Sequence, residues 1–182
     1  MSQRIDWRYL GHVNRPNVIW YKGLFDLAGM IQLIQSWLEE NQYAYQEKKY
    51  KHKVPTPKGV EEDYHAFGRR RMDTYVAFEI HVQFKAWDMQ DVEVIKDGRK
   101  VKMQKGRIRI EMWCVLELDW KSAFETSKFM EKVRNFYNEF IVKKEIDTIW
   151  GDYIYYIMLK LHGEIKKFLN MEASSNIYIT RW

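Results

Sequence analysis

Apolar and polar residues alternate along two long segments of the chain, and this pattern predicts its main strands. In residues 74–87 one face carries a run of apolar side chains: Val76, Phe78, Ile80, Val82, Phe84 and Ala86. Residues 107–120 alternate in the same way, with Ile108 to Leu118 on the apolar face. Successive side chains of a strand point to opposite faces, so we expect two antiparallel strands with one buried and one solvent-facing side.

Less regular patterns predict shorter strands elsewhere. They fall at residues 17–24, 43–54, 62–72, 92–96 and 99–103. Asp97 and Gly98 separate the last two segments. An Asp-Gly pair between short strands is typical of a tight hairpin, because both central residues of that turn need positive φ.

Helical spacing appears at two places. Residues 27–40 carry an apolar stripe that begins at Leu27 and ends at Leu38, and Asp26 stands at the position of an N-cap. Ser122 and Glu125 have the spacing of a capping box, which predicts that a long helical region opens there and continues to Leu169. The apolar phase breaks at Lys143–Lys144, so this region is either two helices or one sharply kinked helix.

The order of these elements predicts the fold class. The apolar face of the sheet needs a cover, and the C-terminal helix is the element large enough to provide it. We expect an α+β protein in which a curled antiparallel sheet of about five to six strands packs on a long, kinked C-terminal helix, with one short helix after the first strand. The 182 residues suit a single domain, with an N-terminal arm at 1–16 and a C-terminal tail at 174–182.

Composition excludes several classes of protein. Hydrophobic residues make up 46% and aromatic residues 16% of the chain, which excludes general disorder. Cys114 is the single cysteine, so no internal disulfide and no thiolate zinc cluster can form. The sequence has no secretory signal and no apolar run near the roughly 20 residues of a membrane span. We therefore expect a cytoplasmic protein without a membrane span.

No catalytic constellation is predicted. The histidines lack ligand spacing, and nucleophile-elbow and phosphate-loop motifs are absent, so we expect no metal, no cofactor and no enzyme activity. Glu79, His81, Arg109 and Glu111 share the polar face of the two long strands, where cross-strand charge pairs commonly stabilise a solvent-exposed surface. A general acid–base pair would need a pocket, and this face is expected to be the outside.

The net charge of +5 includes a lysine-rich segment interleaved with tyrosines. Proteins that bind single-stranded nucleic acids place lysine amines against the phosphates and stack aromatic rings on the bases. The candidate polyanion-binding residues are Lys48, Lys49, Lys51, Lys53, Arg69, Arg70 and Arg71. The acidic run 61–63 would oppose such a ligand, and the alternative is a solvated edge strand whose lysines prevent aggregation.

Aromatic residues outside the expected core predict an interface with a second copy or another protein. These residues are Tyr75, Trp87, Trp113, Tyr155 and Tyr156. The leading hypothesis is a non-catalytic protein-binding or assembly module that forms a homo-oligomer, with the lysine-rich strand as an accessory contact.

The order of elements is also similar to that of helix-grip domains, which bind small ligands. This resemblance implies an alternative function, a small apolar ligand held between sheet and helix. The residues would be Phe78, Ile80, Phe84, Met112, Tyr153, Ile157 and Met158, which otherwise form the core. Residues 22–26, 47–55 and 144–150 resemble segments of small archaeal proteins of unknown function, a resemblance that implies no chemistry.

Overall fold

The computed structural model describes residues 3–6, 17–56, 59–96, 99–124, 127–141 and 149–171. The strands are β1 (Gln3–Asp6), β2 (Asn17–Phe25), β3 (Ala44–Thr56), β4 (Gly59–Arg71), β5 (Val76–Lys96) and β6 (Arg99–Leu118). The helices are α1 (Leu27–Glu40), α2 (Lys128–Phe136), the π-helical segment η1 (Tyr137–Ile141) and α4 (Gly151–Phe168). Among the helices in these ranges, none is long and apolar enough to cross a bilayer.

All six strands form one antiparallel sheet, as expected. The order is β1-β6-β5-β4-β3, and β2 also pairs with β6. β6 is long enough to hold two partners on one edge, with β2 along residues 104–112 and β1 along residues 115–118. β1 lies within the segment predicted as an N-terminal arm, so part of that arm belongs to the sheet.

β5 and β6 form one continuous hairpin that joins the predicted short and long strands. Pairing runs from Val76 opposite Leu118 to Lys96 opposite Arg99, with an irregularity between Trp87 and Gln90. The Asp97–Gly98 turn lies outside the described residues, but the paired residues on either side bracket it.

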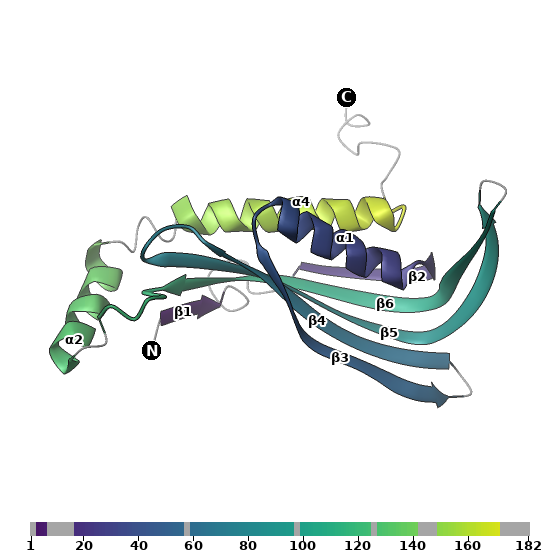
Figure 1. Ribbon diagram of the computed structural model, residues 1–182, viewed down its shortest axis with the longest axis horizontal. Coiled ribbons are helices and arrows are strands. Elements are labelled where there is room, and N and C mark those ends of the chain that lie inside the picture. The colour runs from purple at the N-terminus through teal and green to yellow at the C-terminus, as the bar shows by residue number, and fades with distance from the viewer. Residues whose placement is uncertain are drawn as a thin grey trace, which may run out of the picture.

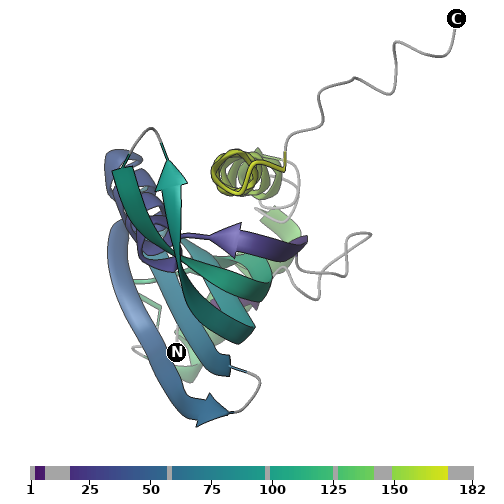
Figure 2. The ribbon, with the colours of Figure 1, turned by 90° about the vertical axis from the view of Figure 1, so that its right-hand side faces the viewer.

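One face of the sheet carries both α1 and α4 (Figures 1 and 2). Between the sheet and these helices lie fully buried side chains from α1, α4, β5 and β6, among them Met30, Ile34, Phe78, Ile80, Ile110, Ile154 and Leu161. α1 spans the predicted residues, and the Asp26 carboxylate accepts a hydrogen bond from Gly29 N at 2.9 Å. Burial of this apolar surface is the main stabilising contribution to the fold.

The predicted start of the C-terminal helical region is wrong. Ser122 lies in a turn with φ of 53°, and Asp119 accepts hydrogen bonds from Ala123 N at 2.8 Å and Phe124 N at 3.3 Å. A carboxylate that binds nearby backbone amides competes with helix formation. α2 starts only at Lys128, capped by Ser127 Oγ, which accepts from Met130 N at 3.2 Å.

A long kinked C-terminal helix is not confirmed. α2 and η1 lie beyond the end of the sheet, and α4 lies along its covered face (Figure 1). The predicted phase break at Lys143–Lys144 falls outside the described residues, as does the predicted tail at 174–182. The helix that covers the sheet is therefore α4, with α1 beside it.

Candidate functional sites

The face of the sheet opposite α1 and α4, called here the helix-free face, holds a polar pocket of about 260 Å³. Five strands supply its walls: Arg4 from β1, Lys48 from β3, His65 from β4, His81 and Gln83 from β5, and Trp113 and Val115 from β6. The register explains this gathering, because His65 pairs with Gln83 and His81 pairs with Trp113. Cross-strand neighbours point to the same side of a sheet.

Sequence analysis placed Glu79 and His81 on an exposed surface, and this expectation is wrong. Glu79 is only 3% exposed, and His81, Trp113, Val115 and Glu117 are also buried. Alternation identifies the residues that share a face, but it does not tell whether the side chains of other strands cover that face. The pocket that an acid–base group requires is therefore present.

A chain of hydrogen bonds runs from the pocket into the buried interior. His65 Nε2 lies 3.1 Å from His81 Nδ1, and His81 Nε2 lies 3.0 Å from Glu79 Oε2. The His81 ring is held between the rings of Trp113 and Phe67. Its centroid lies 5.0 Å from that of Trp113 with an angle of 2° between the ring planes, and 5.1 Å from that of Phe67 with an angle of 20°. This sandwich fixes the plane in which the two ring nitrogens of His81 point.

Two arginines compensate the buried carboxylates below the histidines. Arg4 donates to Glu79, Arg69 Nε lies 3.8 Å from Glu79 Oε1, and Arg69 also donates to Glu117. Burial alone would raise the pKa of Glu79, but the hydrogen bond from His81 and the charge of Arg4 outweigh it and hold the pKa below its usual value. Glu79 is therefore an ionised acceptor at neutral pH.

No group of three or more potential metal ligands lies together within the described ranges. The histidine pair is a hydrogen-bonded unit next to a carboxylate, and imidazoles in this arrangement are able to bind a proton or to donate to an anion.

The predicted polyanion-binding residues do not form one surface. The acidic run 61–63 lies directly opposite the lysines on the neighbouring strand. Asp63 accepts a hydrogen bond from Lys49, and Glu61 accepts one from Lys53 at 2.6 Å. His52 Nδ1 lies 2.9 Å from Glu62 Oε1. The three arginines separate: Arg69 joins the buried network, Arg70 donates to Asn41 O at 3.2 Å, and Arg71 lies 4.5 Å over the Trp120 ring. The segment therefore resembles the solvated edge strand considered as the alternative.

The predicted interface aromatics also take different roles. Trp113 is buried in the pocket wall. Tyr75 is held by η1, through a hydrogen bond to Asn138 and an edge-on contact with Tyr137, and by an edge-on contact with Phe124 in the turn before α2. Tyr155 is half-buried, while Tyr156 on α4 is 63% exposed.

Trp87 stacks on Trp20, an exposed residue of β2 that sequence analysis assigned to a strand without a functional role. The ring centroids are 6.2 Å apart, with an angle of 12° between the ring planes, and Arg109 Cζ lies 5.3 Å from the centroid of the Trp20 ring. The alternation of residues 17–24 carried the signal that Trp20 lies on the face opposite Ile19.

Five of the seven residues proposed to hold an apolar ligand are buried in the core cluster. Phe78, Ile80, Phe84 and Met112 have no exposed surface, and Met158 is also buried. Ile157 is partly buried against this cluster, whereas Tyr153 is 40% exposed, with its ring 6.0 Å from that of Phe78. Burial is expected of core residues and of a ligand site alike, so the ligand hypothesis stays a prediction.

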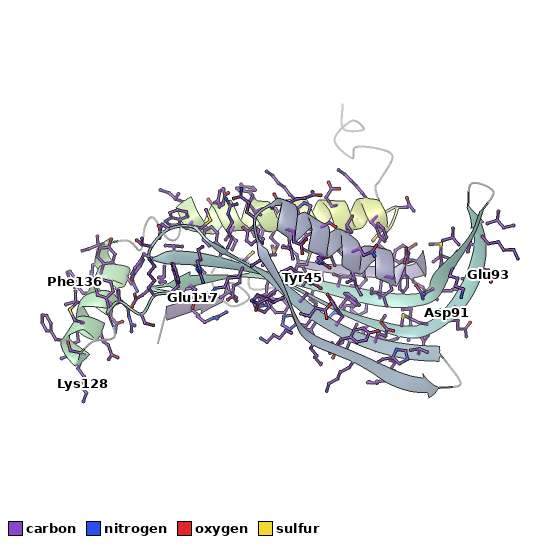
Figure 3. All side chains as sticks on the ribbon, viewed as in Figure 1. Tyr45, Asp91, Glu93, Glu117, Lys128 and Phe136 are labelled. Carbon is purple, nitrogen blue, oxygen red and sulfur yellow. The ribbon has the colours of Figure 1, made fainter. Side chains whose placement is uncertain are left out.

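A second candidate site is the outer face of α2 and η1, called here the α2 face, with Phe129, Val133, Phe136, Phe140 and Ile141. The exposed fractions are 72% for Phe129, 57% for Phe136, 69% for Phe140 and 58% for Ile141. The opposite side anchors to the sheet through Asn138 and through Arg134, whose Nη1 lies 3.8 Å from Asp119 Oδ2. Figure 3 shows Phe136 and Lys128 on this segment, beyond the end of the sheet.

No protein-family model matches the chain, and a search of curated proteins returned no match.

Proposed function

We propose that the protein is a non-catalytic assembly module whose α2 face pairs with the same face of a second copy. The observation that carries this proposal is the exposure of three phenylalanines and one isoleucine on a single short segment. Full burial of one such side chain contributes roughly 1.5–3 kcal/mol. Contiguous apolar patches of this kind mark interaction surfaces.

The spacing of the exposed residues supports a helix as the partner. Phe129, Val133, Phe136 and Phe140 follow one another at intervals of four, three and four residues. This is the spacing of the apolar seam along which two helices pack. The seam continues into η1, because the Phe136 and Phe140 rings stack with centroids 5.1 Å apart.

Charge supports a second copy in antiparallel orientation. Lys132 and Glu139 are both exposed and seven residues apart, so they lie on the same flank of the seam. In an antiparallel pair like flanks face each other, which brings Lys132 next to Glu139 of the partner subunit, twice by two-fold symmetry. In a parallel pair this flank faces Met130 and Tyr137, and both charges lack a counterpart.

Native mass spectrometry and light scattering test this proposal. We expect a dimer of the 22.3 kDa chain, and a monomer after Phe136→Glu, because the introduced charge would be buried in the seam. Tyr156→Glu is the matched control, since it places the same charge on another exposed aromatic residue. A wild-type chain that stays monomeric at high concentration, or a dimer that survives Phe136→Glu, contradicts the proposal.

A charge exchange tests the orientation separately. Lys132→Glu and Glu139→Lys should each weaken the dimer, and the double variant should restore it, because the two residues meet across the interface. Failure of the double variant to recover would reject the antiparallel arrangement.

The other two hypotheses have less support. A helix-grip ligand site needs space between sheet and helices, and the burial of the named sheet side chains does not favour such a site over a packed core. Nucleic-acid binding through the lysine strand needs amines available to phosphate, and Lys49 and Lys53 are paired with carboxylates.

A further inference from the structure

We propose that the pocket on the helix-free face binds a small oxyanion, a sulfate, phosphate or carboxylate group, and that the His65–His81 pair takes up a proton when it does so. This site is separate from the α2 face and does not depend on the proposed assembly.

The charges around the pocket favour an anion. Among the described side chains that line the cavity, Arg4 and Lys48 carry a positive charge and none is a carboxylate. In the layer beneath, Glu79 and Glu117 face Arg4 and Arg69. Among the described side chains, three cations (Arg4, Lys48 and Arg69) against two carboxylates leave one positive charge before the histidines are counted. The flanking ion pairs Lys49–Asp63 and Arg109–Glu111 each sum to zero.

The hydrogen-bond chain determines how the histidines hold protons. The ionised Glu79 only accepts, so His81 Nε2 carries a proton and donates it. When His81 is neutral, its Nδ1 is an acceptor and His65 Nε2 must donate across the 3.1 Å contact. When the pair takes up one more proton, that proton binds His65 Nδ1 and the proton on His65 Nε2 passes to His81 Nδ1, so His81 Nδ1 becomes the donor and His65 Nε2 the acceptor. One added proton therefore reverses the His65–His81 hydrogen bond without breaking it.

An oxyanion in the pocket favours the protonated state. The extra charge lies on a ring in the pocket wall, and the Glu79 carboxylate stabilises the resulting imidazolium. Binding and proton uptake are then linked, so each strengthens the other. The cavity of about 260 Å³ has room for a tetrahedral oxyanion or a small carboxylate with bridging water.

Calorimetry with sulfate tests the proposal, because sulfate keeps a constant charge between pH 5.5 and 8. We expect the affinity for sulfate to increase by about tenfold or more from pH 8 to pH 5.5, as one charge is added near the anion. Titrations in buffers of different ionisation enthalpy should show proton uptake. Acetate in place of sulfate then tells whether a planar carboxylate is accepted.

Three variants assign the effect. His65→Gln and His81→Gln should each abolish the proton uptake, and Lys48→Met should weaken sulfate binding at both pH values. His52→Gln is the matched control, since His52 pairs with Glu62 away from the pocket and its loss should change neither quantity. Because His81 is buried and its replacement could unfold the chain, ¹⁵N spectra of the wild-type imidazoles provide a second readout. They should show His81 changing from a single tautomer to the doubly protonated form on sulfate addition.

Several results would overturn the proposal. They are the absence of sulfate binding to the folded wild-type protein, binding that is independent of pH, and proton uptake that persists in both histidine variants. Binding that is lost with His52→Gln would place the site elsewhere.

Discussion

Replacement of Glu79 by Gln removes the central charge of the network beneath the pocket. The carboxylate accepts from Arg4 and from His81 Nε2 at 3.0 Å and lies 3.8 Å from Arg69 Nε. A glutamine of the same shape keeps one acceptor oxygen but introduces an amide donor that faces donors. Arg4 and His81 would then lack their anionic partner, whereas Arg69 would keep Glu117.

The burial of Glu79 sets the size of the effect. Removal of one partner from a buried ion pair costs about 3–5 kcal/mol, whereas an exposed pair contributes at most about 1 kcal/mol. Glu79 is fully enclosed, but Arg4 is half-exposed and can turn toward water. We therefore expect Glu79→Gln to lower the free energy of unfolding by about 3 kcal/mol at pH 7, at the low end of the buried range.

The effect should depend on pH in one direction. The pKa of Glu79 in the folded protein lies below its usual value of 4.5, so ionisation stabilises the folded state above that pH. This stability is lost as the pH falls through the folded pKa. The difference between wild type and Glu79→Gln should hence be constant near neutral pH and shrink below about pH 4.

Urea denaturation followed by circular dichroism measures both quantities. Glu93→Gln is the matched control, because Glu93 is exposed and its oxygen lies 3.7 Å from Lys100 Nζ. Its cost should stay below about 0.5 kcal/mol. If Glu79→Gln costs no more than this control, or if its effect grows as the pH falls, the network does not stabilise the fold as argued.

Three other predictions concern the packing at Gly68, the helix propensity at Gly163 and the cap at Asp26. A Cβ at Gly68 would lie 2.7 Å from Leu38 Cδ2 and 2.8 Å from Tyr43 Cβ, so Gly68→Ala should lower the free energy of unfolding by about 1–3 kcal/mol. A Cβ at Gly163 in α4 would meet no atom within 4 Å, and alanine has the higher helix propensity. Gly163→Ala should therefore raise the free energy of unfolding by about 0.5–1 kcal/mol in the same assay. Asp26→Ala removes the cap of α1 and should cost about 1 kcal/mol, whereas Asp26→Asn, which keeps an acceptor, should cost less; equal losses would show that the cap is unimportant.

The periodicity of apolar residues predicted the helices and strands whose buried and exposed sides differ most in polarity. The bounds of α1 followed from its apolar stripe and the Asp26 cap, and the β5–β6 hairpin from alternation interrupted at Asp97–Gly98. β1 was missed because four residues are too few for a pattern to emerge. The start of α2 was misplaced because the backbone amides after Ser122 bind the Asp119 side chain, a contact that depends on where β6 ends.

The pocket could not be predicted for a different reason. Alternation correctly placed Glu79, His81 and Trp113 on one face, but the cover of that face comes from other strands. Arg69 reaches it from β4 and Arg4 from β1, and no local pattern connects these segments to β5. The absence of a pocket was therefore inferred from polarity alone, which does not distinguish a solvated face from a buried network.

The two proposed sites should act independently, because the segments that carry them are joined by few contacts. α2 and η1 touch the sheet through Asn138 and Arg134, at the end where β5 begins and β6 terminates. The pocket draws on His65, His81 and their neighbours, which hold one another through hydrogen bonds and ring stacking within the sheet. Phe136→Glu should hence yield a monomer that binds sulfate with unchanged affinity and pH dependence. If sulfate binding is lost together with the dimer, the pocket is completed by the second copy, and the oxyanion site would have to be redrawn across the interface.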